Sequence, residues 1–269
     1  MKNKLTVLKL GGSVITKKEK LFTPNKRTIT RLVKEIKFAS VESLLVVHGG
    51  GSFGHPVAKK YGINEGFKDS SQILGFSKTH QAMVSLNKLI LDTLIQEGIP
   101  AMTIQPSSLI ITDNGRMQRT DVKIVSRLLE LEIIPLLYGD VVLDSVQGFS
   151  ILSGDQLVSS LAIKLGADRM ILGIDVDGLC TSDPKIDPSA RLIQYINLQE
   201  LKNLQHKIGE AKGPDVTGGM LGKILELIPA VEHGIRAIIV NATKPNNVYR
   251  ALKGEKIIGT IIEKDDKIA

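Results

Sequence analysis

Two short apolar segments that run directly into glycines constrain the fold more than any other feature of the sequence. Leu44 to Val47 is too short and too rich in β-branched residues for a helix, and His48 and a run of glycines follow it. Leu5 to Leu10 leads in the same way into Gly11-Gly12-Ser13. Glycine loops at the carboxyl ends of buried strands let backbone N–H groups approach a phosphate, because no Cβ shields them. The two units predict one polyanion that is held from two sides.

The rest of the chain alternates strand patterns with helical patterns, which favours an α/β fold with a mainly parallel sheet covered on both faces. Amphipathic spacing predicts helices over 25–39 and 156–165, and a longest helix over 79–97 that Gly98 ends. Shorter helices are expected over 122–131 and 198–204 and from about 217, and strands over 100–105, 133–138, 169–174, 235–241 and 256–263, with 247–252 between the last two strands.

Two β-hairpins interrupt this alternation. Leu109 to Thr112 and the polar residues after Asn114-Gly115 form the first, because Asn-Gly supplies the pair of positive φ angles of a type I′ turn. Val141 to Ser153 holds the second, with its turn near Gln147-Gly148. The hairpins are expected either as a lid over the glycine loop that follows Val47 or as decoration at the edge of the sheet, and the sequence leaves both open.

Composition excludes several classes of protein. The 269 residues are 42% hydrophobic, but no apolar run reaches the roughly 18 residues of a membrane span, and Met1 to Lys9 lacks the apolar core of a signal peptide. We therefore expect a soluble, cytoplasmic protein without membrane contact. The net charge is +7, but the lysines are dispersed, Trp is absent and aromatics are 4%, so nucleic acid is not expected as a partner. The single cysteine, Cys180, excludes a disulfide framework and is expected to be a small core residue.

Basic side chains near the glycine loops are candidates for phosphate contacts. Lys17 and Lys18 follow the first loop closely enough to reach a phosphate, although a solvated loop explains them equally well. His48 ends a buried strand, where a structural histidine is more common than a catalyst, whereas His55 lies beyond the glycines and is better placed to reach a phosphate. The remaining histidines are His80, His206 and His233, and their spacing is not that of metal ligands. We therefore predict no metal site built by the protein itself.

Five motifs in one order along the chain resemble the amino acid kinase family. They are Lys9-Leu10-Gly11-Gly12-Ser13, His48-Gly49-Gly50-Gly51, Ser153-Gly154-Asp155, Asp175-Val176-Asp177-Gly178 and Thr217-Gly218-Gly219-Met220 with Lys223. A single lysine-glycine-glycine motif is weak evidence, but five in order are specific, and together they span almost the whole chain. Val14 to Lys18 and Ser52 to Pro56 further resemble one branch of the family, in which the phosphoryl acceptor is a small prenyl monophosphate.

The resemblance implies an ATP-dependent kinase with the fold of a three-layer α/β/α sandwich around a mainly parallel central sheet. Residues 1–269 would form a single domain, in which about 1–166 bind the acceptor and carry the hairpins, and about 167–269 bind the nucleotide. The resemblance also implies Mg²⁺ bound through ATP, and we expect a homodimer. Two highly charged phosphates meet in such a transfer, so catalysis is mostly charge neutralisation and in-line positioning.

The resemblance implies roles for individual residues as well. Asp155 would orient Lys9 and Lys223, and capping of the helix over 156–165 is a compatible second role for Asp155. His55 would donate to the acceptor phosphate, which is already a dianion at neutral pH and needs no general base. Lys17 or Lys18 would be a further catalytic cation. The nucleotide would contact Lys9, Gly11, Gly12, Ser13, Gly51, Asp175, Asp177, Gly178, Gly218, Gly219 and Lys223, and the acceptor phosphate Gly50, Gly51, His55 and Gly154.

Apolar residues in and before the long helix favour a hydrophobic acceptor. Its tail needs an apolar pocket beside the glycine loop, and we expect Phe76 or Met83 to close the pocket floor, with core packing as an equal alternative for both. The alternative activities, each with a different phosphoryl acceptor, are those of a fosfomycin-type phosphonate kinase, an acetylglutamate kinase and a uridylate kinase. A nucleotide-binding sensor without catalysis is the alternative from another class, and the combination of Lys9, Asp155 and Lys223 argues against it.

Overall fold

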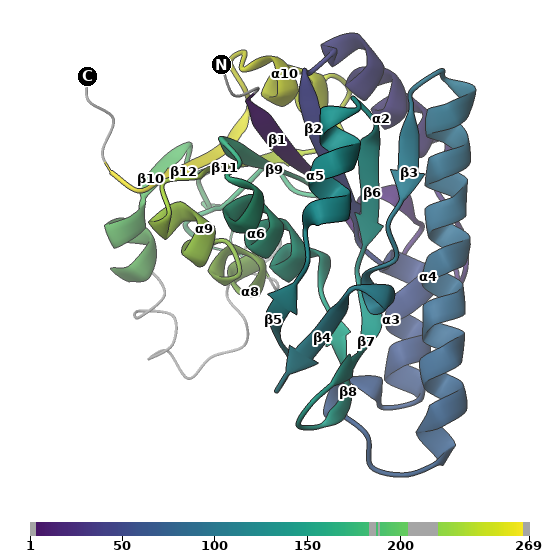
Figure 1. The fold of residues 1–269 in the computed structure, drawn as a ribbon. Helices are drawn as coiled ribbons and strands as arrows, with labels where there is room; N and C mark the ends of the chain where they lie inside the picture. Colours follow the sequence, from purple (N-terminus) through teal and green to yellow (C-terminus); the bar gives the residue numbers. More distant parts are fainter. Residues whose placement is uncertain (1–3, 183–186, 188, 204–219, 266–269) are drawn as a thin grey trace.

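The computed structural model describes residues 4–182, 187, 189–203 and 220–265, and at residues 119, 220 and 221 it describes the backbone alone. Its centre is an eight-stranded sheet (Figure 1). In spatial order the strands are β10 (Tyr195–Asn197), β12 (Gly259–Glu263), β11 (Arg236–Asn241), β9 (Arg169–Ile174), β1 (Leu5–Leu10), β2 (Ser43–His48), β6 (Ile134–Tyr138) and β3 (Ala101–Thr103). Every neighbouring pair is parallel except β11 and β12, so the expected mainly parallel sheet is confirmed.

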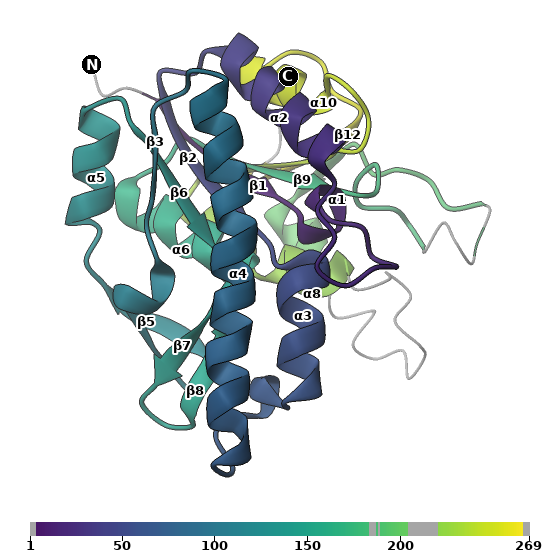
Figure 2. The same ribbon diagram turned by 90° about the vertical axis from the view of Figure 1, so that its right-hand side faces the viewer.

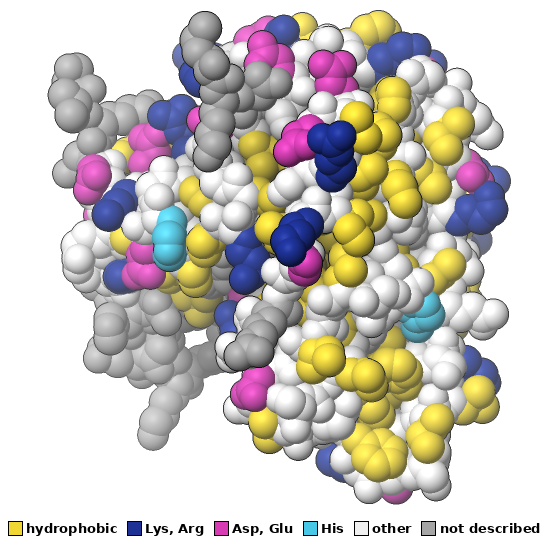
Figure 3. Space-filling model, in the orientation of Figure 1, with side chains coloured by type: hydrophobic (Ala, Val, Ile, Leu, Met, Phe, Trp, Pro, Cys, Tyr) yellow, Lys and Arg dark blue, Asp and Glu magenta, His cyan; other side chains and the backbone are white. Residues whose placement is uncertain are grey.

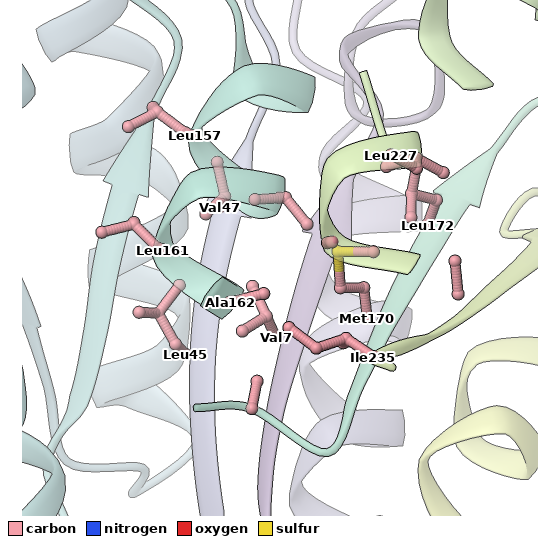
Figure 4. Close-up of a cluster of buried hydrophobic side chains, with 14 of the residues drawn as sticks. Val7, Leu45, Val47, Leu157, Leu161, Ala162, Met170, Leu172, Leu227 and Ile235 are labelled. Carbon is pink, nitrogen blue, oxygen red and sulfur yellow. The ribbon is translucent and has the colours of Figure 1, made fainter. Parts of the chain in front are cut away.

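Helices cover both faces of this sheet. Because side chains alternate along a strand, Leu5 and Val7 of β1 enter one hydrophobic core, while Leu8 and Leu10 enter the other. The first core, part of which Figure 4 shows, is covered by α5 (Lys123–Glu130), α6 (Gly154–Leu165), α8 (Met220–Leu225) and α9 (Ile228–Glu232). The second is covered by α1 (Gly12–Ile15), α2 (Lys26–Ala39), α4 (Ser71–Gln96) and α10 (Asn247–Lys253), of which α2 and α4 lie in front in Figure 2. The three-layer α/β/α sandwich is therefore confirmed.

Helix α2 illustrates how local sequence specifies an element. The side chain of Asn25 accepts a hydrogen bond from the Thr28 backbone N–H and so caps the first turn. One stripe of the helix is buried in the second core, as the amphipathic spacing predicts: Ile29, Leu32, Val33 and Ile36. Residues 198–203 are also helical, as expected, and short 3₁₀ turns lie at Ile63–Glu65 and Pro106–Ser108.

Helix α3 (Gly51–Lys60) is a departure from the sequence prediction, which treated the residues after Val47 as a glycine loop and expected no helix there. Glycine and proline both disfavour helix, so the segment gives no local helical signal. Pro56 has no N–H to donate to the carbonyl of Ser52 one turn earlier, and that carbonyl instead accepts from the Phe22 N–H at 3.1 Å. A contact from a distant loop therefore satisfies the one acceptor that the proline leaves open.

Helix α4 begins at Ser71, well before the expected start at Thr79. Gly75 lies within this extra length and obscured it, since glycine weakens a helical pattern. A Cβ at Gly75 would lie 2.3 Å from Cβ of Tyr61, so the close packing of α4 against the end of α3 requires glycine there. Tertiary packing extends the helix beyond what its own sequence favours.

The two expected hairpins are confirmed, and they join into one four-stranded sheet in the order β5, β4, β7, β8. Their strands are β4 (Ile110–Asp113), β5 (Arg116–Thr120), β7 (Asp140–Asp144) and β8 (Gly148–Leu152). Asn114 and Gly115 have φ angles of 47° and 74°, as a type I′ turn requires. The sequence gives no sign that β4 pairs with β7, which brings the two hairpins together.

No described helix is both long and apolar enough to span a bilayer. On the face that Figure 3 draws, Lys and Arg side chains are interspersed with Asp and Glu, and no basic stripe stands out among the described residues.

A single carboxylate holds the two hairpin turns together. Asp144 is 6% exposed, and its oxygens accept hydrogen bonds from groups on both turns: the N–H groups of Asn114 (3.2 Å), Gly115 (2.7 Å), Val146 (2.9 Å) and Gln147 (2.9 Å), and the Thr112 hydroxyl (2.7 Å). Burial opposes ionisation of Asp144, but these donors outweigh it and hold its pKa far below the usual range.

We expect Asp144→Ala to lower the free energy of unfolding at pH 7 by about 1–3 kcal/mol, because several buried donors lose their acceptor. Since the pKa is lowered in the folded state, the stabilisation is complete above the unfolded pKa of about 4 and is lost as the pH falls below it. Urea unfolding between pH 3 and pH 7 measures this. Asp113→Ala, which removes one exposed hydrogen bond to Ser145, is the matched control. A difference between wild type and Asp144→Ala that does not change with pH would contradict the role of the carboxylate.

Candidate functional site

A cavity of about 500 Å³ lies where the carboxyl ends of β1, β2 and β9 meet. The loops after these three strands line it, together with the start of α6, the hairpin of β7 and β8, and parts of α3 and α4. It brings together most of the residues predicted from the sequence: Lys9, Gly11, Gly12, Ser13, Lys18, Gly50, Gly51, His55, Met83, Gly154, Asp155, Asp175, Gly178 and Lys223.

The two glycine loops touch each other backbone to backbone. A Cβ at Gly12 would lie 2.2 Å from the Gly51 nitrogen, and a Cβ at Gly51, whose φ is +49°, would lie 2.1 Å from Oγ1 of Thr16. The Thr16 hydroxyl donates to the Gly12 carbonyl at 2.7 Å and accepts from the Ser52 N–H at 2.9 Å. Glycine is required at both positions by this close approach.

A largely buried ion pair joins the end of β1 to α6. Lys9, at the end of β1, is 4% exposed, and its Nζ lies 2.6 Å from Oδ1 of Asp155 in the first turn of α6. The N-cap of α6 is Ser153, whose hydroxyl accepts from the Gln156 N–H at 3.1 Å, so the capping role considered for Asp155 is wrong. Asp155 is instead a first-turn carboxylate that holds a lysine at the cavity wall.

His55 lies on α3 with its side chain open to the cavity. The protein around the ring desolvates it and lowers its pKa, and the charges of Lys223 and Lys9 lower the pKa further, while Asp155 opposes them. The imidazole is therefore neutral at pH 7, with one N–H to donate. The two lysines that influence it come from opposite ends of the chain.

Of the two loop lysines, Lys18 reaches the cavity and Lys17 does not line it. Nζ of Lys18 lies 2.6 Å from Oδ2 of Asp175, in the loop after β9. This pair crosses from the first glycine loop to the loop that was expected to hold the nucleoside. Burial raises the pKa of Asp175, but hydrogen bonds from Lys18 and Ser13 outweigh this and hold the pKa below its usual range.

Several predicted residues lie elsewhere. Phe76 does not line the cavity, because its ring packs on Phe149 at 5.4 Å between ring centroids. Asp177 also does not line it and instead pairs with Lys244, with 2.7 Å between Oδ1 and Nζ. Gly218 and Gly219 lie outside the described residues.

The structural interpretation of His48 is confirmed. His48 is completely buried and donates from Nδ1 to the Gly49 carbonyl at 3.1 Å, while Nε2 accepts from the Asn87 amide at 3.2 Å. The Thr103 hydroxyl completes the chain by donating to Asn87 at 2.6 Å. Burial lowers the pKa of His48 to about 4, although the bond to Gly49 opposes this, so the ring is neutral at pH 7. His48 therefore supports the glycine loop from behind.

Comparison with known proteins agrees with this geometry. The model of the amino acid kinase family matches residues 4–241. The chain belongs to the amino acid kinase family. Among curated members, it is 42% identical to an isopentenyl phosphate kinase of Methanothermobacter thermautotrophicus, over 96% of this chain and 98% of that protein. It is 36% identical to the isopentenyl phosphate kinase of Methanocaldococcus jannaschii, again over 96% and 98% of the two chains.

Solved structures of the family give the same result. An isopentenyl phosphate kinase crystal structure superposes with a TM-score of 0.85 at 40% identity, and covers 96% of this chain and 100% of that one. The structure of the Thermoplasma acidophilum isopentenyl phosphate kinase in a product complex superposes with a TM-score of 0.75 at 28% identity, with the same coverage of both chains. The resemblance to the amino acid kinase family and to this branch of it is thus confirmed.

One end of the cavity in this family member is apolar, and the sequence did not reveal most of it. Met83 was predicted, but three further apolar residues that line the cavity come from α3 and from the β7–β8 hairpin and share one buried cluster: Ala58, Val141 and Ile151. The β7–β8 hairpin is therefore a cavity wall, whereas β4 and β5 contribute no lining residue in the described part of the chain. The apolar residues of the expected second hairpin were the available signal.

Cys180 is a correction to the prediction of a core position. It is partly exposed and lines the cavity beside the loop that follows β9. The prediction considered only the small, apolar character of a lone cysteine. The position of Cys180 two residues after Gly178 was the signal that it belongs to the cavity loop.

Proposed function

We propose that this protein transfers the γ-phosphoryl group of ATP to isopentenyl phosphate, giving isopentenyl diphosphate. The observation that carries the proposal is a cavity with two unlike ends. Glycine amides and lysines line one end, and Ala58, Met83, Val141 and Ile151 line the other. An acceptor with a phosphate and a short apolar tail fits both ends, whereas an amino acid or a nucleotide would leave its polar groups unpaired against the apolar wall. The relatives named isopentenyl phosphate kinase support the same acceptor.

Charge neutralisation is the main catalytic contribution in this proposal. Lys9, Lys18 and Lys223 line the cavity and would face the phosphates, whose negative charges must approach each other. A carboxylate in the same place would repel the phosphates unless it were paired. Asp155 is paired with Lys9 at 2.6 Å, so we assign it the orientation of that lysine.

The glycine loops and His55 would hold the acceptor phosphate. The second pKa of a phosphate monoester is about 6, so the acceptor is mostly a dianion at pH 7 and its oxygen needs no base to become a nucleophile. The lowered pKa of His55 leaves a neutral ring with one N–H, which suits a donor to that dianion. The backbone of Gly50 and Gly154, both in the cavity wall, is assigned to the same phosphate.

The nucleotide is assigned to the C-terminal part of the chain, about residues 167–269. Asp175, Gly178 and Lys223 come from this part and line the cavity. Asp177 would act indirectly, by fixing the loop through Lys244 and Asn241. Mg²⁺ enters as part of the MgATP substrate in this proposal. We also propose a cytoplasmic homodimer, which would pair through β3, the edge strand on which Met102 is half-exposed.

An acceptor panel tests the proposed function. We expect purified protein with MgATP to show a kcat/KM for isopentenyl phosphate at least about tenfold above that for fosfomycin, acetylglutamate or UMP, because only the prenyl tail fills the apolar end. Coupled detection of ADP measures the rates. A higher kcat/KM for any other acceptor would move the protein to another activity of the family. Binding of ATP without turnover of any acceptor would identify a sensor.

We expect His55→Ala to reduce turnover of isopentenyl phosphate by about ten- to a hundredfold, the cost of a lost hydrogen bond to a charged group. Binding of a non-hydrolysable ATP analogue should stay within about twofold of wild type, since the lost donor faces the acceptor. Steady-state kinetics and isothermal titration calorimetry separate the two effects. His233→Ala, an exposed histidine that does not line the cavity, is the control. Normal turnover of His55→Ala would exclude the proposed role.

Cys180 is the single cysteine of the chain and lines the cavity, so its alkylation reports on occupancy of the nucleotide side. We expect a saturating ATP analogue to slow modification of Cys180 by iodoacetamide several-fold, because the nucleotide would cover the loop that carries it. Isopentenyl phosphate alone should protect less. Mass spectrometry of the labelled peptide measures the rates. Protection by the acceptor and none by the ATP analogue would reverse the assignment of the two halves.

A further inference from the structure

An imidazole–carboxylate pair joins α4 to β7 beside the cavity, which Asp140 lines and His80 does not. Nδ1 of His80, on α4, lies 2.9 Å and 3.1 Å from the two carboxylate oxygens of Asp140, the first residue of β7. The side chain of Asp140 is completely buried, while that of His80 is 27% exposed. Asp140 itself lines the cavity. Neither residue belongs to a motif that marks the phosphate-binding end.

The neighbours of this pair are the walls of the apolar compartment. Thr79, which precedes His80, and Met83, one turn later on α4, line one side. Val141 follows Asp140 and lines the other side, where it pairs across β7 and β8 with Ile151. The distance between α4 and β7 at the His80–Asp140 pair therefore determines the width of the compartment.

Burying the Asp140 carboxylate beside apolar side chains costs desolvation free energy, so the His80–Asp140 pair is not explained by stability alone. Burial raises the pKa of Asp140, and the charge and hydrogen bond of His80 lower it, with help from the Val141 N–H and the Ser107 hydroxyl. Apolar side chains of similar size would hold two walls together at least as well. Hydrophobic contacts are non-directional, however, whereas a carboxylate that accepts from a ring nitrogen fixes both distance and orientation.

We propose that His80 and Asp140 form a clasp that fixes the separation of α4 and β7, positions the acceptor's apolar tail and limits its length. This inference rests on the proposed function. The clasp makes no contact with phosphate in this scheme. His80 and Asp140 are positioning residues that act through Met83, Val141 and Ile151, the side chains that would contact the tail.

Steady-state kinetics of His80→Ala, Asp140→Ala and the double variant test the clasp. We expect each to raise the KM for isopentenyl phosphate about tenfold, a change of one decade in affinity. The KM for ATP should stay within twofold, because the nucleotide does not reach these walls. The kcat/KM for geranyl phosphate relative to isopentenyl phosphate should rise at least fivefold. The double variant should be no worse than either single one, since both remove the same contact.

Two further variants separate positioning from general stability. Asp140→Asn keeps an oxygen that accepts from Nδ1 of His80, so it should restore most of the wild-type selectivity. Lys88→Ala breaks an exposed ion pair with Asp92 on the same helix and should leave all kinetic constants unchanged. If Asp140→Ala does not fold, His80→Ala and Asp140→Asn still carry the test, because His80 is partly exposed.

The outcomes distinguish the clasp from the proposed function. Parallel increases of both KM values together with a lower urea midpoint would show a merely structural pair. Unchanged KM and unchanged chain-length preference in His80→Ala would overturn the clasp while wild-type activity on isopentenyl phosphate stands. Absence of that activity in the wild-type protein would overturn the proposed function itself.

Discussion

The contact between Gly12 and Gly51 is the constraint on which the rest of the site depends. Strands β1 and β2 are parallel neighbours with Leu10 opposite His48, so the loops that follow them emerge at the same level of the sheet. The loops meet with no side chain between them, and a Cβ on either glycine would overlap the other loop or Thr16. This approach creates one cradle of backbone donors instead of two separate ones. The strand register and the glycines are both needed for it.

The charges of the site follow from the cradle. A lysine that is 4% exposed at a strand end is stable only beside an opposite charge, and Asp155 provides that charge from the first turn of α6. Lys9 and Lys223 in turn lower the pKa of His55 together with desolvation, so that the ring stays neutral among cations. The same arrangement that would attract phosphates thus keeps the histidine a hydrogen-bond donor. Removing any one of these charged side chains would change the pKa values of the others, because their charges interact at short range.

The sequence predicted those elements whose signal is local. The amphipathic stripe of α2, the strand β9 at Arg169–Ile174 and the Asn114-Gly115 turn lie where they were expected. Helix α3 was missed because its glycines and Pro56 argue against a helix, and only the bond from Phe22 to Ser52 compensates for the proline. For Phe76 the sequence left pocket floor and core packing open, because its spacing from Met83 on one helix says nothing of Phe149, which it packs against from another element.

The two ends of the cavity also differ in how well the sequence predicts them. The polar end is built from glycines that directly follow β1 and β2 and from lysines such as Lys9 at the end of β1, so short motifs reveal it. The parallel sheet brings the two glycine loops together at one edge. The apolar end is assembled from α3, α4 and the β7–β8 hairpin, whose residues carry no motif and are far apart in sequence. Hydrophobic residues of similar size satisfy such a wall, so its shape has to be fixed by something directional. His80 and Asp140 are the polar residues placed to do that, and acceptor choice would therefore depend on contacts that no motif records.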